Sequence, residues 1–254
     1  MRPPRASSAR ARRCASWRRR TLAGLRAGLL ASLLGAVPAA WSAEEAGAGG
    51  GMADRVRACA ACHGPQGRAT PGGYFPRIAG KPAGYLYHQL LHFQAGRRHN
   101  EAMQHLLQHL SSAYLQEIAG HFASLDLPYP PAAPDRLTPP ERARAERLVH
   151  HGAPERELPA CASCHGQALA GTLPATPGLT GLSADYLIGQ LGAWRTGQRR
   201  AHAPDCMAEV ARRLSAEEVG LVARWLAARP PTPGARPAPA PAAALPLRCG
   251  SASP

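Results

Sequence analysis

One five-residue pattern, Cys-x-x-Cys-His, occurs twice and constrains the fold of this chain more than any other feature. The copies are CAACH at residues 59–63 and CASCH at residues 161–165. Two thiols about one helical turn apart can each add to a vinyl group of one porphyrin, and the next imidazole can then bind the iron. Each copy therefore predicts one covalently attached haem c. The residues assigned to attachment and proximal ligation are Cys59, Cys62, His63, Cys161, Cys164 and His165.

Paired cysteines have two other common uses, a four-cysteine zinc site and a dithiol redox pair. Zinc gives no reason for a histidine directly after the second cysteine in both copies. A redox pair is rarely duplicated together with that histidine. Haem attachment is the favoured interpretation, provided that the chain is exported.

The N-terminus has the layout of a secretory signal peptide, which we assign to residues 1–43. The first twenty residues hold eight arginines and no acidic residue, and an apolar run interrupted by Arg26 follows from Leu22 to Val37. This run is too short to span a bilayer as a helix. We predict cleavage between about residues 39 and 43 and a periplasmic mature protein; an uncleaved anchor is the alternative.

Removal of the signal changes the charge of the chain. Residues 1–43 carry nine arginines and no acid, so the formal net charge falls from +14 to +5. The basic character therefore belongs mostly to the signal, and we expect no nucleic-acid partner. Two cysteines remain outside the motifs and the signal, Cys206 and Cys249, and they can pair in an oxidising compartment.

The two motifs lie in two related halves. Residues 75–93 (FPRIAG, later YLYHQLLHF) correspond to residues 176–194 (TPGLTG, later YLIGQLGAW) at a constant offset of 101. The shared apolar residues recur at a spacing that places them on one helix face. A final helix closes each half, and Ser215 with Glu218 predicts a capping box at the start of the second one. The sequence therefore predicts a duplicated all-α domain.

We predict two tandem cytochrome c-like domains, at residues 52–126 and 141–229, each built around one haem. Residues 127–140 are rich in proline, which favours an extended linker. Residues 230–254 have a Pro/Ala-rich composition that cannot bury a core, and we predict that this tail is disordered. Each domain is small, so the covalently bound porphyrin supplies part of its core.

Each half has one methionine after its motif. Met103 follows His63 by 40 residues and Met207 follows His165 by 42. A thioether favours Fe(II), so a histidine–methionine pair raises the haem potential. We predict that these methionines are the second axial ligands. Core packing is the alternative for both, and for the first iron the nearby histidines are further candidates: His99, His105 and His109.

Together, these motifs resemble the two-haem class I cytochromes c of the cytochrome c4 type, over about residues 52–229. The resemblance implies two cytochrome c folds related by a pseudo-twofold axis, with the haems close through their propionate edges. It implies that the backbone carbonyls of Pro76 and Pro177 fix the rings of His63 and His165.

The resemblance also places Arg77 near a haem propionate. Gly178 stands at the matching position of the second half. We therefore expect the two haems to differ in environment and in potential.

The function implied by the resemblance is a periplasmic, non-enzymatic carrier of single electrons between redox partner proteins, a membrane donor complex and a terminal oxidase or similar acceptor. Peripheral attachment to a membrane is left open. One alternative is a haem enzyme that oxidises a small sulfur anion, as thiosulfate dehydrogenases do, with Cys206 as an iron ligand. Another is a cytochrome subunit of a dehydrogenase complex.

Overall fold

The computed structural model describes residues 50–252 except residues 71, 235, 242 and 243, and all of these belong to one compact unit, Gly47–Pro254. The predicted signal peptide and its cleavage site lie outside the described residues. Within the described part, no helix is both long enough and apolar enough to cross a membrane.

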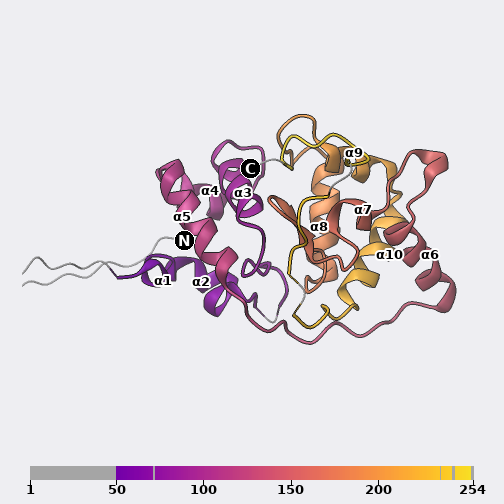
Figure 1. Cartoon of the computed structure of the whole chain (residues 1–254), viewed down its shortest axis with the longest axis horizontal. Coiled ribbons are helices and arrows are strands. Elements are labelled where there is room, and N and C mark those ends of the chain that lie inside the picture. The colour runs from indigo at the N-terminus through magenta and orange to yellow at the C-terminus, as the bar shows by residue number, and fades with distance from the viewer. Residues whose placement is uncertain (1–49, 71, 235, 242–243, 253–254) are drawn as a thin grey trace, which may run out of the picture. The chain divides into compact units, whose positions relative to one another are not determined.

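The first half is built from helices whose apolar faces meet in one core (Figure 1). The buried side chains of that core include Leu86 and Phe93 from one helix and Leu115 and Phe122 from another. The helices are α1 (Met52–Arg55), α2 (Arg57–His63), α3 (Ala83–Gln94), α4 (Glu101–Leu107) and α5 (Ser112–Ser124), with a 3-10 turn at Pro65–Gly67.

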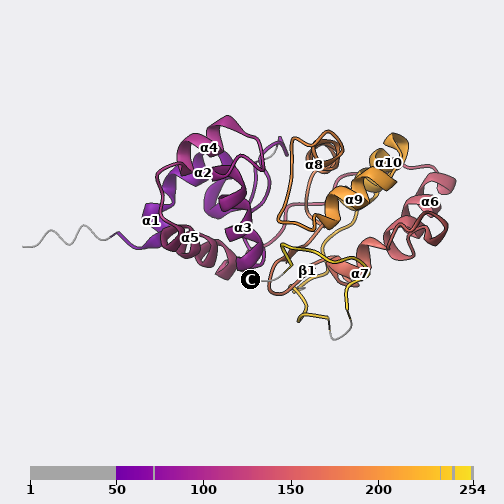
Figure 2. The ribbon, with the colours of Figure 1, turned by 90° about the horizontal axis from the view of Figure 1, so that it is seen from above.

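The second half repeats this arrangement of helices (Figure 2). It has its own core, in which Leu187 and Trp225 are buried. Helix α8 begins and ends 101 residues after α3, which is the offset between the sequence repeats. The helices are α6 (Pro139–His150), α7 (Cys161–His165), α8 (Ala184–Arg195), α9 (Cys206–Arg213) and α10 (Ala216–Ala227), with a 3-10 turn at Pro154–Arg156.

The prediction of an all-α fold is confirmed, with one small addition. Strands β1 (Gly171–Thr172) and β2 (Thr176–Pro177) pair antiparallel, with Gly171 opposite Pro177. This is the only sheet in the described part of the chain. The predicted capping box is also present at the start of α10, because the Glu218 amide donates to Ser215 Oγ and the Ser215 amide donates to the Glu218 carboxylate.

The C-terminal tail differs from the disorder that its composition predicts. Its Ala238 exchanges backbone hydrogen bonds with Gly171 and Leu173 at 2.9 and 2.7 Å. A disulfide joins Cys249 to Cys206. The described tail residues, drawn in yellow in Figure 1, therefore lie against the second half. By contrast, residues 125–138 contain no helix or strand, as expected of an extended linker.

Candidate haem sites and the contact between the halves

Both Cys-x-x-Cys-His motifs end a helix. Residues 59–63 form the end of α2 and residues 161–165 form all of α7. The helical backbone separates the two cysteines of each motif by about one turn, so both thiols face the same side. Each motif histidine is the last helical residue and is buried, with 9% of His63 and 6% of His165 exposed.

The ring of each motif histidine is fixed by one backbone carbonyl. His63 Nδ1 lies 2.9 Å from the Pro76 oxygen, and His165 Nδ1 lies 2.7 Å from the Pro177 oxygen. These are the two contacts that the resemblance implies. A carbonyl can only accept, so Nδ1 carries the proton and Nε2 keeps the lone pair that binds a metal. Burial lowers the pKa of both imidazoles, which favours this neutral form.

The motif cysteines are free thiols, each half-buried. Burial raises the pKa of Cys161 to about 11 and also raises the pKa of Cys59 and of Cys164. Reactive redox dithiols depend instead on a lowered pKa. Nor do the described residues contain any group of three or more His, Cys, Asp or Glu side chains arranged to hold a metal ion, as a zinc site requires. The donor set thus fits covalent haem.

The two methionines occupy matching helices. Met103 is in α4, which packs on α3, and Met207 is in α9, which packs on α8. Each helix begins with a side-chain cap: Asn100 Oδ1 accepts from the Met103 amide at 3.0 Å, and Asp205 Oδ1 accepts from the Ala208 amide at 3.1 Å.

Burial distinguishes Met103 from the nearby histidines as a candidate second axial ligand of the first iron. Met103 is half-buried and packs against the core of the first half. The three histidines near it in sequence are exposed to solvent: His99, His105 and His109. An iron inside the domain is therefore better served by the thioether than by these imidazoles.

Cys206 is bonded to Cys249 and is not a free thiol. A thiolate ligand to the second iron, as the enzymatic alternative requires, is unavailable while this disulfide is intact.

Arg77 is buried, with 2% of its surface exposed, and it contacts the linker. Its guanidinium donates to the carbonyls of Leu127 and Pro128 at 2.6 and 3.0 Å, and it lies over the Tyr129 ring at 4.0 Å. Sequence analysis missed this contact, because nothing in the local pattern links Arg77 to residues fifty positions away. Arg77 thus holds the start of the linker against the first half.

A pair of arginines joins the two halves symmetrically. Each reaches, in the opposite half, a glutamine and a tyrosine of the repeated YLxxQL segment, and the backbones at the two arginines form an antiparallel bridge. Within the described residues, neither arginine forms an ion pair with an acid. The six side chains are Arg98 with Tyr186 and Gln190, and Arg199 with Tyr85 and Gln89.

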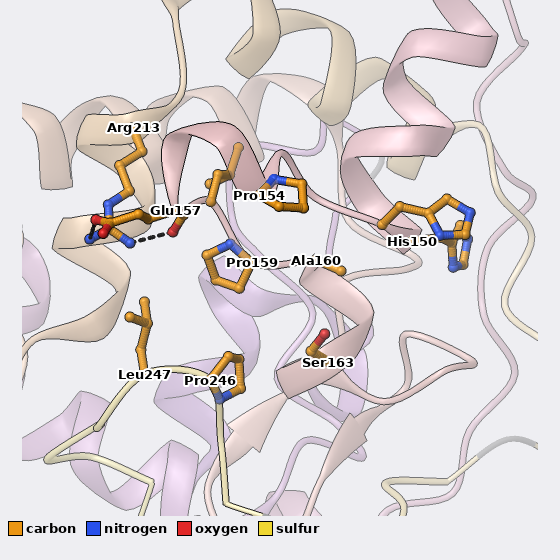
Figure 3. Close-up of a pocket in the computed structure, with 11 residues that line it drawn as sticks. His150, Pro154, Glu157, Pro159, Ala160, Ser163, Arg213, Pro246 and Leu247 are labelled. Carbon is orange, nitrogen blue, oxygen red and sulfur yellow. Dashed lines mark hydrogen bonds and ion pairs between the residues drawn. The ribbon is translucent and has the colours of Figure 1, made fainter.

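An open pocket of about 780 Å³ lies beside the second motif (Figure 3). Ser163 of the motif lines it, together with His150 from α6 and the ion pair of Arg213 with Glu157, whose charged atoms are 3.4 Å apart. No motif cysteine or histidine and neither candidate methionine is among the lining residues. The residues assigned to haem attachment and iron ligation therefore do not form this pocket.

No protein-family model matches the chain. Over 204 residues the chain is 36% identical to the thiosulfate dehydrogenase electron acceptor of Thiomonas intermedia (strain K12), and the match covers 80% of this chain and 89% of that protein.

The chain also resembles solved structures, among them one of a cytochrome c4 and one of a thiosulfate dehydrogenase. The reduced recombinant cytochrome c4 from Pseudomonas stutzeri has a TM-score of 0.60 and 30% identity, covering 69% of this chain and 95% of that one. The as-isolated thiosulfate dehydrogenase (TsdBA) from Marichromatium purpuratum has a TM-score of 0.61 and 33% identity, covering 68% of this chain but only 36% of that one.

Proposed function

Because the chain belongs to the cytochrome c4 family of two-haem c-type cytochromes, we propose that it is a periplasmic carrier in which one histidine and one methionine hold each iron. Membership of the family gives the chain two covalently bound haem c groups, redox partner proteins and the function of an electron carrier, not an enzyme. When bound, each haem iron alternates between Fe(II) and Fe(III) and so holds one electron.

The observation that carries the proposal is the matched geometry of the halves. In each, a buried histidine turns its Nδ1 to a proline carbonyl, and a capped short helix presents one methionine. The carbonyls fix the orientation of His63 and His165 and leave Nε2 free for the iron. Met103 and Met207 supply thioethers, which favour Fe(II) and keep both irons closed to substrate.

The ligand assignment is tested by three alanine variants made in a host that attaches haem c. Met103→Ala and Met207→Ala should each remove half of the near-infrared band that marks methionine-ligated ferric haem. Met52→Ala is the matched control, because Met52 is the one other methionine after the predicted signal and also packs on a core. If the full band remains after a methionine is replaced, that methionine is not an iron ligand.

We propose further that the electron donor is a thiosulfate-oxidising dehydrogenase. The support is the name of the relative at 36% identity and the likeness to part of the TsdBA chain. In the test, the oxidised protein is mixed with thiosulfate alone and then with thiosulfate plus such a dehydrogenase, and haem reduction is followed by absorbance. Reduction should require the dehydrogenase. Reduction by thiosulfate alone would favour the enzymatic alternative, and no reduction in either mixture would exclude this donor.

Further experiments test whether the protein is exported and whether it is stable without a dehydrogenase. Cell fractionation should place it in the periplasm, and N-terminal sequencing should find a start between about residues 40 and 44. Expressed alone, it should elute as a stable monomer. A protein that is stable only together with a dehydrogenase would instead be a subunit of that complex.

A further inference from the structure

Lys81 is the only lysine of the chain, and it is buried. The other 29 basic residues are arginines. Only 5% of Lys81 is exposed, although lysine is rarely buried without a partner. A single, buried ammonium in a chain that otherwise uses guanidinium groups indicates a specific role for a compact charge.

The ammonium of Lys81 reaches from the first half into the second. Lys81 Nζ donates to the Gly178 carbonyl at 2.8 Å. Gly178 is the counterpart of Arg77 at the repeat offset of 101 residues. The first half therefore supplies a cation to the backbone of the residue that, in the second half, stands in place of an arginine.

This position adjoins the ring of the second motif histidine. Pro177 and Gly178 present consecutive carbonyls, the first to His165 Nδ1 and the second to Lys81 Nζ. Two adjacent backbone carbonyls therefore bring the Lys81 ammonium next to the segment that holds the ring of the predicted proximal ligand of the second iron.

The surroundings of Lys81 offer it no anion. Among the described residues, it makes one hydrogen bond, to a neutral carbonyl, and no ion pair. Burial and the charge of Arg77 lower its pKa to about 7. A buried ammonium of this kind is unfavourable unless a negative group pairs with it. The haem carboxylates are the negative groups that the family brings to this chain.

We propose that Lys81 is a positioning residue for the second haem: across the contact between the halves, it pairs with a carboxylate of the haem attached at Cys161 and Cys164 and raises that haem's potential. The proposal rests on the proposed binding of haem at this motif. A fixed positive charge near an iron stabilises Fe(II) over Fe(III), because Fe(II) carries one positive charge fewer. The repeat does not provide an equivalent lysine for the first haem, since Leu182 stands at the position matching Lys81.

The test is a redox titration of the two-haem protein and its variants, with each potential assigned through Met103→Ala and Met207→Ala. Lys81→Met removes the charge and keeps the length of the side chain. It should lower the second potential by about 59 mV, which corresponds to a tenfold shift of a one-electron equilibrium towards Fe(III). The first potential should stay unchanged.

Two further variants separate charge from structure. Lys81→Arg keeps the charge and should leave the second potential near the wild-type value. Arg224→Met removes an exposed charge from the half that carries the second haem, where solvent screens it, and should change neither potential. Haem content and thermal unfolding of each variant show that it is folded.

Two results would overturn the proposal: a second potential that is unchanged in Lys81→Met, or one that falls equally in Lys81→Arg. Both would leave the methionine band of the second haem in place. Failure of the Lys81 proposal is therefore distinguishable from failure of the proposed ligation, which would remove that band in the wild-type protein.

Discussion

The disulfide between Cys206 and Cys249 ties the C-terminal tail to the helix that carries Met207. Cys206 is the first residue of α9 and directly precedes the methionine. The tail then covers the segment that leads into α9, because the Gly250 amide donates to the Pro204 carbonyl at 2.9 Å. A double variant, Cys206→Ser with Cys249→Ser, removes the covalent part of this attachment.

The expected loss of stability follows from the length of the loop. The two cysteines are separated by 43 residues. In the chain-entropy model a loop of this size lowers the entropy of the unfolded chain by about 13 cal/mol/K, or about 4 kcal/mol at 25 °C. The haem does not close this loop, since its thioethers join residues that precede Cys206. The second half should therefore lose about 4 kcal/mol of unfolding free energy.

The assay is urea unfolding followed by circular dichroism and by the near-infrared methionine band. The band of the second haem should be lost at a lower urea concentration than in the wild-type protein. The band of the first haem is the internal control, because Met103 lies in the other half and should be unaffected. A loss below about 1 kcal/mol, or an equal change in both halves, would refute the argument.

Three further predictions concern single side chains. Hydrogen bonds from Arg156 lower the pKa of Glu218 from its ordinary value of about 4.5 to about 2. The ionised carboxylate therefore contributes its full share of folding stability above about pH 4.5, and this share is lost as the pH falls through 2. Glu218→Gln should therefore destabilise the second half by about 1–3 kcal/mol in urea titrations at pH 7, and by progressively less as the pH falls through 2. Asn100→Ala removes the cap of α4 and should cost the first half about 1 kcal/mol in urea titrations. Arg199→Met should separate the calorimetric unfolding transitions of the halves, and Arg200→Met, at an exposed position, should not.

Features encoded locally were predictable from the sequence. The motif helices and the capping box at Ser215 each depend on residues within a few helical turns. The helical periodicity of the YLxxQL segments predicted α3 and α8, because one apolar face needs only a core to pack on. The proline carbonyls at Pro76 and Pro177 came from the family resemblance, and the structure contains both contacts.

Features that depend on distant partners were not predictable. The composition of the tail indicates disorder, since proline and alanine offer little apolar surface. Its order comes instead from Gly171 and Leu173, which pair with Ala238, and from Cys206, which bonds to Cys249. Cysteine counting did indicate that Cys206 and Cys249 can pair, and the structure contains this disulfide. The backbone partners of Ala238 lie more than 60 residues away in sequence, so no local pattern predicts them.

The contact between the halves combines a symmetric and an asymmetric part, and only the second can distinguish the haems. Arg98 and Arg199 exchange equivalent partners, so their charges act on both halves alike. Lys81 has no equivalent, because leucine stands at the matching position, and its ammonium is held at Gly178. A duplicated domain begins with two identical sites, and a preferred direction of electron flow requires that their potentials differ. In this chain Gly178 stands at the position that matches Arg77, and a lysine of the first half reaches the Gly178 carbonyl, so we expect the difference in potential to arise there.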